Sequence, residues 1–74
     1  MQEWQWGILF REIEGYIEQA KKMENFYQND NPIDDYSRGF NRAVIRCSQS
    51  EARTFQMLLD TVKQFREGEK QNAV

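Results

Sequence analysis

Only one stretch of this 74-residue chain carries a strong turn and helix-capping signal, and it divides the chain into two long halves. It covers residues 28–32 and reads QNDNP. Asn31 is a favourable helix N-cap and Pro32 suits the first helical position. Asp34 and Asp35 then fall in the first turn, where the helix dipole favours negative charge. A second helix is therefore expected to begin at residue 32.

In the first half, apolar residues recur at helical spacing while charged residues fall elsewhere on the helical wheel. The apolar set is Leu9, Ile13, Tyr16, Ile17, Ala20, Met23 and Tyr27. This pattern predicts one long amphipathic helix over about residues 2–28, followed by a turn at 28–31.

The second half allows two interpretations, because residues 48–51 read SQSE and match a capping box that would start a third helix. The phase of the apolar residues decides between them, since a chain break would scramble it. At about 100° per residue, six of them share a sector roughly 60° wide. They are Phe40, Val44, Cys47, Leu58, Val62 and Phe65. We therefore expect one continuous helix over 32–68, a single domain over 1–68, and a flexible tail at 69–74 after Gly68 as C-cap.

The expected fold is all-α: a two-helix antiparallel hairpin with a long second helix. A further apolar line, Ile45, Ala52 and Leu59, lies roughly 100–140° round that helix from the six-residue stripe. A single core of this size rarely contributes more than about 3–5 kcal/mol, and one cysteine excludes an internal disulfide. We therefore expect an oligomeric helical bundle, such as a dimer of hairpins, with this line and Trp6 at the interface. Scattered surface apolar residues are the alternative.

Composition excludes several classes of function. The chain has no histidine and one cysteine, so the usual zinc and iron sites are excluded and no catalytic set or cofactor is expected. Cys47 is interpreted as a small packing residue. A net charge of −2 provides no basic field for nucleic acid. No apolar run approaches the roughly 18 residues of a membrane span, and no basic signal region opens the chain, so a cytoplasmic protein without a membrane partner is expected.

The candidate ligand-binding residues are four arginines on one side of the second helix: Arg38, Arg42, Arg46 and Arg53. Arg38 has acids three and four residues before it, whereas the other three have none at either spacing. From 42 to 53 the row spans roughly 16 Å. It is either a solvated face or a site for phosphate or an acidic protein surface, which the planar guanidinium fork suits.

Two further residues are singled out by their positions. Trp4 points away from the apolar stripe of the first helix and is a binding hot spot, part of a frayed terminus, or a residue folded back onto the longer second helix. Glu51 is the one charged residue inside the apolar sector of the second helix, so its carboxylate needs a cationic partner or water.

The segment 36–43, YSRGFNRA, resembles a pattern in small helical-hairpin proteins of bacteriophages and prophages. Tyr36, Gly39, Phe40, Asn41 and Ala43 carry the resemblance. It implies a compact product that blocks a host defence enzyme or sequesters a cyclic nucleotide signal, and it brings no site residues with it. We therefore expect a non-enzymatic, phage-type oligomer that antagonises a host defence, by nucleotide sequestration or by masking a host protein, in the host cytoplasm. A nucleic-acid-binding regulator and a purely structural assembly protein are the alternatives.

Overall fold

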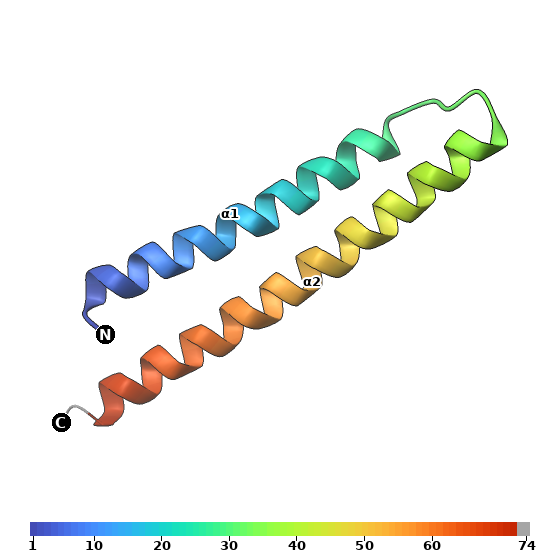
Figure 1. Ribbon diagram of the computed structural model, residues 1–74. Helices are drawn as coiled ribbons and strands as arrows, with labels where there is room; N and C mark the ends of the chain where they lie inside the picture. Colours follow the sequence, from blue (N-terminus) through green and yellow to red (C-terminus); the bar gives the residue numbers. More distant parts are fainter. Residues whose placement is uncertain (73–74) are drawn as a thin grey trace.

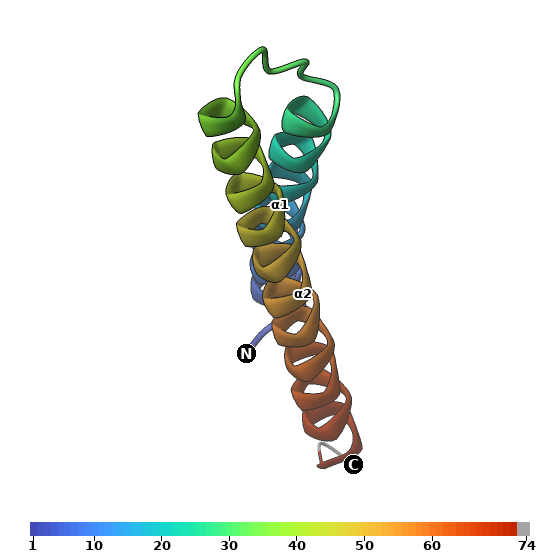
Figure 2. The same ribbon diagram turned by 90° about the vertical axis from the view of Figure 1, so that its right-hand side faces the viewer.

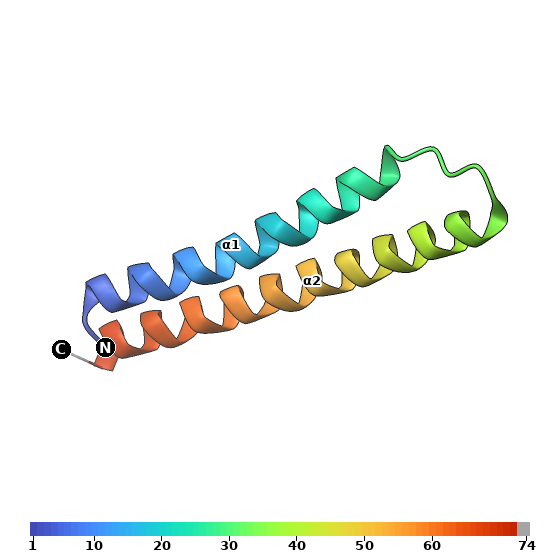
Figure 3. The same cartoon turned by 45° about the horizontal axis from the view of Figure 1, so that its top comes forward.

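The computed structural model describes residues 1–72, which form two helices lying side by side and antiparallel (Figure 1). Helix α1 spans Glu3–Gln28 and helix α2 spans Asp35–Asn72. Both rotated views show the same elongated hairpin, with extents of 61 × 16 × 12 Å (Figures 2 and 3). The predicted all-α hairpin is confirmed, and α2 runs without a break through residues 48–51. Within the described residues, neither helix is long and apolar enough to cross a membrane.

The start of α2 differs from the prediction by three residues. Asp34, rather than Asn31, is the N-cap: its Oδ1 accepts the Ser37 N–H at 2.7 Å and its carbonyl accepts the Arg38 N–H at 3.1 Å. Aspartate is among the preferred N-cap residues, and its charge adds a favourable interaction with the helix dipole. The linker is therefore residues 29–34 rather than 28–31. It is tied to α2 by the Asn41 amide, which donates to Asp30 Oδ2 at 2.9 Å.

The end of α2 also lies beyond the predicted boundary. The helix passes through Gly68, which does not adopt a positive φ, and continues to Asn72. The predicted flexible tail at 69–74 is thus helical up to residue 72, and residues 73–74 lie outside the described part. Ionic contacts with the start of α1 hold this end: Glu3 pairs with Arg66, and the N-terminal amine lies 2.6 Å from Glu69 Oε1.

The two helices meet along one seam in which steps of three and four residues alternate. On α1 the seam residues are Trp6, Phe10, Ile13, Ile17, Ala20, Glu24 and Tyr27, and on α2 they are Asn41, Ile45, Ser48, Ala52, Phe55, Leu59, Val62 and Arg66. Each of them is buried or half-buried. Alternating steps of this kind average 3.5 residues, which is the repeat of a coiled coil. Ile13, Ile17 and Leu59 form its centre.

This seam corrects the expected roles of the two apolar lines on α2. Leu59 is 4% exposed and packs on α1, with Ile45 and Ala52 half-buried in the same seam. Trp6 is likewise buried within the hairpin, so these four expected oligomer-interface residues pack inside one chain.

The stripe that was expected to face α1 is the more exposed of the two, since Phe40 and Phe65 are 52% and 68% exposed. Of its six residues, Val62 does pack in the seam. The physical reason for the exposure is Glu51, which interrupts that stripe. Placing the stripe in the seam would bury the carboxylate of Glu51, which forms no ion pair in the described chain.

Leu59→Ala tests this assignment of the seam. The substitution is expected to lower the free energy of unfolding by about 2–4 kcal/mol, because it leaves a cavity at the centre of the core. Ile8→Ala is the matched control, since Ile8 is 51% exposed on α1 and its truncation should cost less than about 1 kcal/mol. Urea denaturation followed by circular dichroism measures both, and equal losses would contradict the seam.

The Asp34 cap predicts a pH dependence of stability. The backbone N–H of Ser37 donates to this carboxylate, and this lowers the pKa of Asp34 below its usual 3.8. The stabilisation is therefore complete above about pH 5 and is lost as the pH falls through the lowered pKa. Asp34→Asn keeps a good cap without a charge, so the melting temperature of this variant should fall less between pH 5 and pH 2 than that of the unaltered chain. If the melting temperatures of the two proteins fell equally between pH 5 and pH 2, the charge of the Asp34 carboxylate would not contribute to stability.

Candidate functional site

Helix α2 has three sides, and the hairpin uses one of them. At about 100° per residue, the seam, a face almost without charge, and the arginine row are separated from one another by roughly 120°. The second and third sides are therefore the surfaces on which α2 can meet something other than α1.

The second side, named here the low-charge face, runs from Phe40 to Phe65. It consists of Phe40, Ala43, Val44, Cys47, Ser50, Glu51, Thr54, Met57, Leu58, Thr61, Gln64 and Phe65. Glu51 is its single charged residue, and its largest side chains are well exposed, with Met57 at 69% and Leu58 at 45%. A continuous apolar and hydroxyl-bearing face of this kind is typical of a protein contact surface rather than of a solvated helix face.

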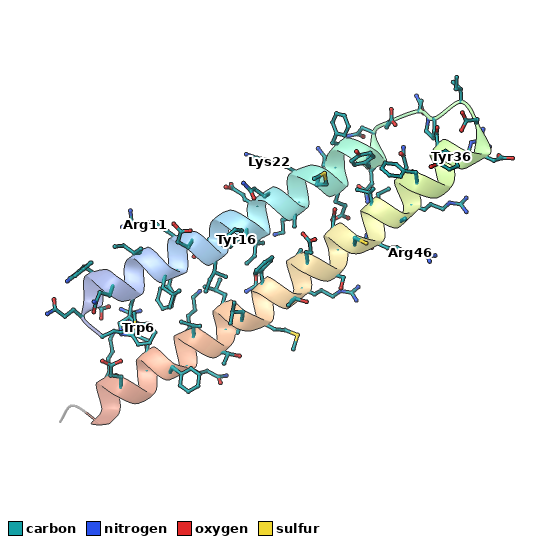
Figure 4. The ribbon with its side chains drawn as sticks, in the orientation of Figure 1. Trp6, Arg11, Tyr16, Lys22, Tyr36 and Arg46 are labelled. Carbon is teal, nitrogen blue, oxygen red and sulfur yellow. The ribbon has the colours of Figure 1, made fainter. Side chains whose placement is uncertain are left out.

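A groove of about 570 Å³ lies where the low-charge face meets α1. Tyr16 and Met23 of α1 form one wall, and Phe40, Val44 and Glu51 contribute to the other. The Tyr16 ring points toward α2 (Figure 4) and stacks on Phe55 with 5.2 Å between ring centroids. The groove extends the low-charge face onto α1.

Glu51 is therefore the one charged residue in a largely apolar lining, as its place on the helical wheel predicts. Its carboxylate has no ion-pair partner among residues 1–72, so water solvates it in the open groove. The cationic partner that the sequence left as one possibility for Glu51 stays a prediction.

The arginine row forms the third side. Arg38 lies 3.5 Å from Asp35, at the i, i+3 spacing expected from the sequence. Arg42, Arg46 and Arg53 are exposed and form no ion pair with any described residue, and Arg46 extends away from α1 (Figure 4). A guanidinium without an ion-pair partner can donate to a planar, bidentate anion without first breaking an internal ion pair.

The acids of α1 that might have paired with this row lie elsewhere. Glu14 and Glu18 line a second, more polar groove on the other side of the hairpin, together with Lys21 and Lys63. Neither groove is lined by Arg42, Arg46 or Arg53, so the row is a convex surface.

Trp4 does not join the arginine row. It is 61% exposed, and its indole Nε1–H donates to Gln2 Oε1 at 2.7 Å. The neighbouring Glu3 pairs with Arg66, which places Trp4 beside the C-terminal part of α2. The four arginines lie on the half of α2 nearer the linker, so the two parts of the predicted ligand site occupy different ends of the rod.

Metal-ligand groups, the single thiol and comparison with known proteins add little information about function. Among the described residues, no three His, Cys, Asp or Glu side chains are grouped so that they could hold a metal ion, and Cys47 is an exposed free thiol. Comparison with protein-family models, curated proteins and solved structures finds no match to this chain. Function must therefore be argued from the surfaces of α2.

The sequence interpretation identified the arginine row but missed the low-charge face. The signal was available, because between residues 40 and 65 the charges of α2 avoid one sector of the wheel, with Glu51 as the exception. It was missed because its larger residues were assigned to the contact with α1.

Two arginine substitutions test whether the row has a structural role. Arg46→Ala should change the free energy of unfolding by less than about 0.5 kcal/mol, because Arg46 forms no ion pair in the described chain. Arg66→Ala should lower it by about 1 kcal/mol, because Arg66 pairs with Glu3 and its guanidinium carbon lies 5.7 Å from the Phe10 ring centroid. Urea titrations measure both. A loss at Arg46 as large as that at Arg66 would mean that the row holds the fold together.

Proposed function

We propose that this chain is a non-enzymatic binding protein that masks an acidic surface of a partner protein through Arg42, Arg46 and Arg53. The observation that carries the proposal is that these three guanidinium groups are exposed and without an acidic partner in the described chain. Like charges at helical spacing cost a few tenths of a kcal/mol per pair, so an anionic partner offsets a cost that the free chain bears.

The shape of the row favours a protein partner over a small molecule. Small ligands are usually enclosed in concave sites, whereas these arginines lie on a convex helix surface outside both grooves. A length of roughly 16 Å matches a short acidic segment or one edge of an acidic domain. The absence of histidine and of a metal-ligand set from the sequence supports binding rather than catalysis.

The resemblance of residues 36–43 to small phage and prophage proteins supports a host defence protein as the partner. In this proposal the chain acts in the cytoplasm of the host cell. Binding would antagonise the defence by covering a surface that the defence protein needs.

A labelled decaglutamate peptide serves as the probe for an acidic surface. Combined Arg42→Gln, Arg46→Gln and Arg53→Gln is expected to weaken binding at least tenfold, because three charge-assisted contacts are lost at roughly 0.5–1 kcal/mol each. Combined Arg11→Gln, Lys21→Gln and Lys22→Gln removes the same charge from α1 and should change affinity less than twofold. Fluorescence anisotropy measures both. If both triple variants bound the peptide equally weakly, binding would depend on net charge alone, and the proposal would be overturned.

Two other anions, tested beside the peptide, distinguish the alternative functions. A cyclic dinucleotide that raises the melting temperature of the chain, with the rise lost in Arg42→Ala or Arg46→Ala, would assign the row to nucleotide sequestration instead. Duplex DNA that binds more tightly than the peptide, with affinity falling steeply with salt, would favour the nucleic-acid regulator.

A further inference from the structure

The groove between α1 and the low-charge face has the dimensions of a ligand site. Its volume of about 570 Å³ lies within the roughly 300–1,000 Å³ that is usual for small-molecule sites. Small side chains form its floor, since Ala20 and Ser48 line the groove and are buried in the seam. The lining of α2 runs from Phe40 to Phe55, which is about 22 Å along the helix. The groove can therefore hold an elongated small molecule.

Aromatic side chains lie at both ends of this lining. At one end, Tyr16 of α1 stacks on Phe55 of α2, with 5.2 Å between ring centroids. At the other end, Phe40 packs edge to face on Tyr27, with 6.0 Å between centroids. Aromatic faces pack on apolar bodies and attract cations, because the face of the ring carries partial negative charge. Both ends of the groove therefore suit an apolar ligand, and a cationic one more than an anionic one.

Glu51 is the one charged residue that lines the groove, and it lies between the two aromatic ends. Glu51 precedes Phe55 by four residues and Ala20 follows Tyr16 by four, so Glu51 and Ala20 lie at the same level of the antiparallel hairpin. Its carboxylate forms no ion pair with any described residue, and neither lysine nor arginine lines the groove. The chain thus provides the anion and the apolar walls of a site, but not the cation.

From this arrangement we infer that the groove binds an organic monocation, in which one protonated or quaternary amine is attached to an apolar body. The ammonium group pairs with Glu51, and the body packs on Tyr16, Met23 and Phe40. The apolar body shields the ion pair from water, and the lower local dielectric strengthens the attraction.

The lining disfavours other classes of occupant. A metal ion needs several ligand atoms, and Glu51 is the only carboxylate in the lining. A peptide segment brings backbone N–H and C=O groups that need partners, and a mostly apolar lining provides few. A neutral or anionic apolar molecule would cover the Glu51 carboxylate without pairing it, which costs free energy. An organic monocation matches both the apolar walls and the single charge.

Dansylcadaverine serves as the probe, because it carries one positive charge on an apolar, fluorescent body at neutral pH. Its N-acetyl derivative has the same body without the charge. The unaltered chain is expected to bind the cation roughly fivefold to tenfold more tightly than the N-acetyl derivative, since only the cation pairs with Glu51. Fluorescence anisotropy measures both affinities. Equal affinities, or no binding of the cation, would overturn the inference.

A matched pair of charge variants tests the role of Glu51. Glu51→Gln keeps the size of the side chain and should abolish the preference for the cation, while the N-acetyl derivative binds at least as well as before. Glu67→Gln removes the same charge from an exposed position of α2 outside the groove and should keep the preference. If both variants lost the preference equally, net charge alone would explain it, and the site would be wrong.

A filled groove tests the location of the probe. Ala43 lines the groove but is exposed, so Ala43→Phe adds a ring there without entering the seam. Both probes are expected to bind at least about fivefold more weakly. Met57→Phe, on the same helix but outside the groove, should bind them as the unaltered chain does. Circular dichroism confirms that the variants are helical, and unchanged binding by Ala43→Phe would place the probe elsewhere and overturn the inference.

The inference does not depend on the proposed function, because Arg42, Arg46 and Arg53 do not line the groove. Combined replacement of these arginines by Gln should keep the preference for dansylcadaverine over its N-acetyl derivative. Glu51→Gln should keep the binding of decaglutamate. Loss of one activity therefore leaves the other intact, and the two proposals can fail separately. Loss of the preference in the arginine variant would place the cation outside the groove and overturn the inference.

Discussion

The whole structure depends on one seam in which two helices interlock at a 3.5-residue repeat. The chain has a single linker and a single cysteine, and its described residues contain no metal-ligand cluster, so this seam is what keeps α1 and α2 together over the length of the rod. Its centre is aliphatic, around Ile13, Ile17 and Leu59, and its ends are polar. At one end Asn41 bonds to Asp30, and at the other Glu3 pairs with Arg66. The aliphatic centre supplies the free energy of packing, while the polar ends make a slipped register costly because slipping would unpair them.

A hairpin with one seam leaves most of each helix uncovered, and the two helices differ in which residues their uncovered surfaces carry. The charged side of α1 mixes both signs, as Arg11, Glu14, Glu18 and Lys21 illustrate, which is typical of a solvated helix face. The outer surface of α2 is instead sorted into a face almost without charge and a row of like charges. Sorting of this kind is unfavourable for an isolated helix, since it exposes apolar area on one side and accumulates repulsion on the other. Helix α2 therefore carries the surfaces suited to binding.

The sequence predicted the number and continuity of the helices because those properties depend on local periodicity. Choosing the seam was harder. Two apolar lines on α2 lie roughly 100–140° apart, and either satisfies a helical period. Local periodicity does not choose between them, because the choice depends on tertiary packing. The line on α2 from Ile45 to Leu59 carries no charged residue, whereas the other line meets Glu51.

The helix start was misjudged for a similar reason. Asn31 and Asp34 are both acceptable caps, and only the bond from the Ser37 N–H distinguishes them. The unpaired arginines were predictable, since ion pairs along a helix depend on spacing alone. The separation of Trp4 from them was not, because it depends on how the second helix folds back.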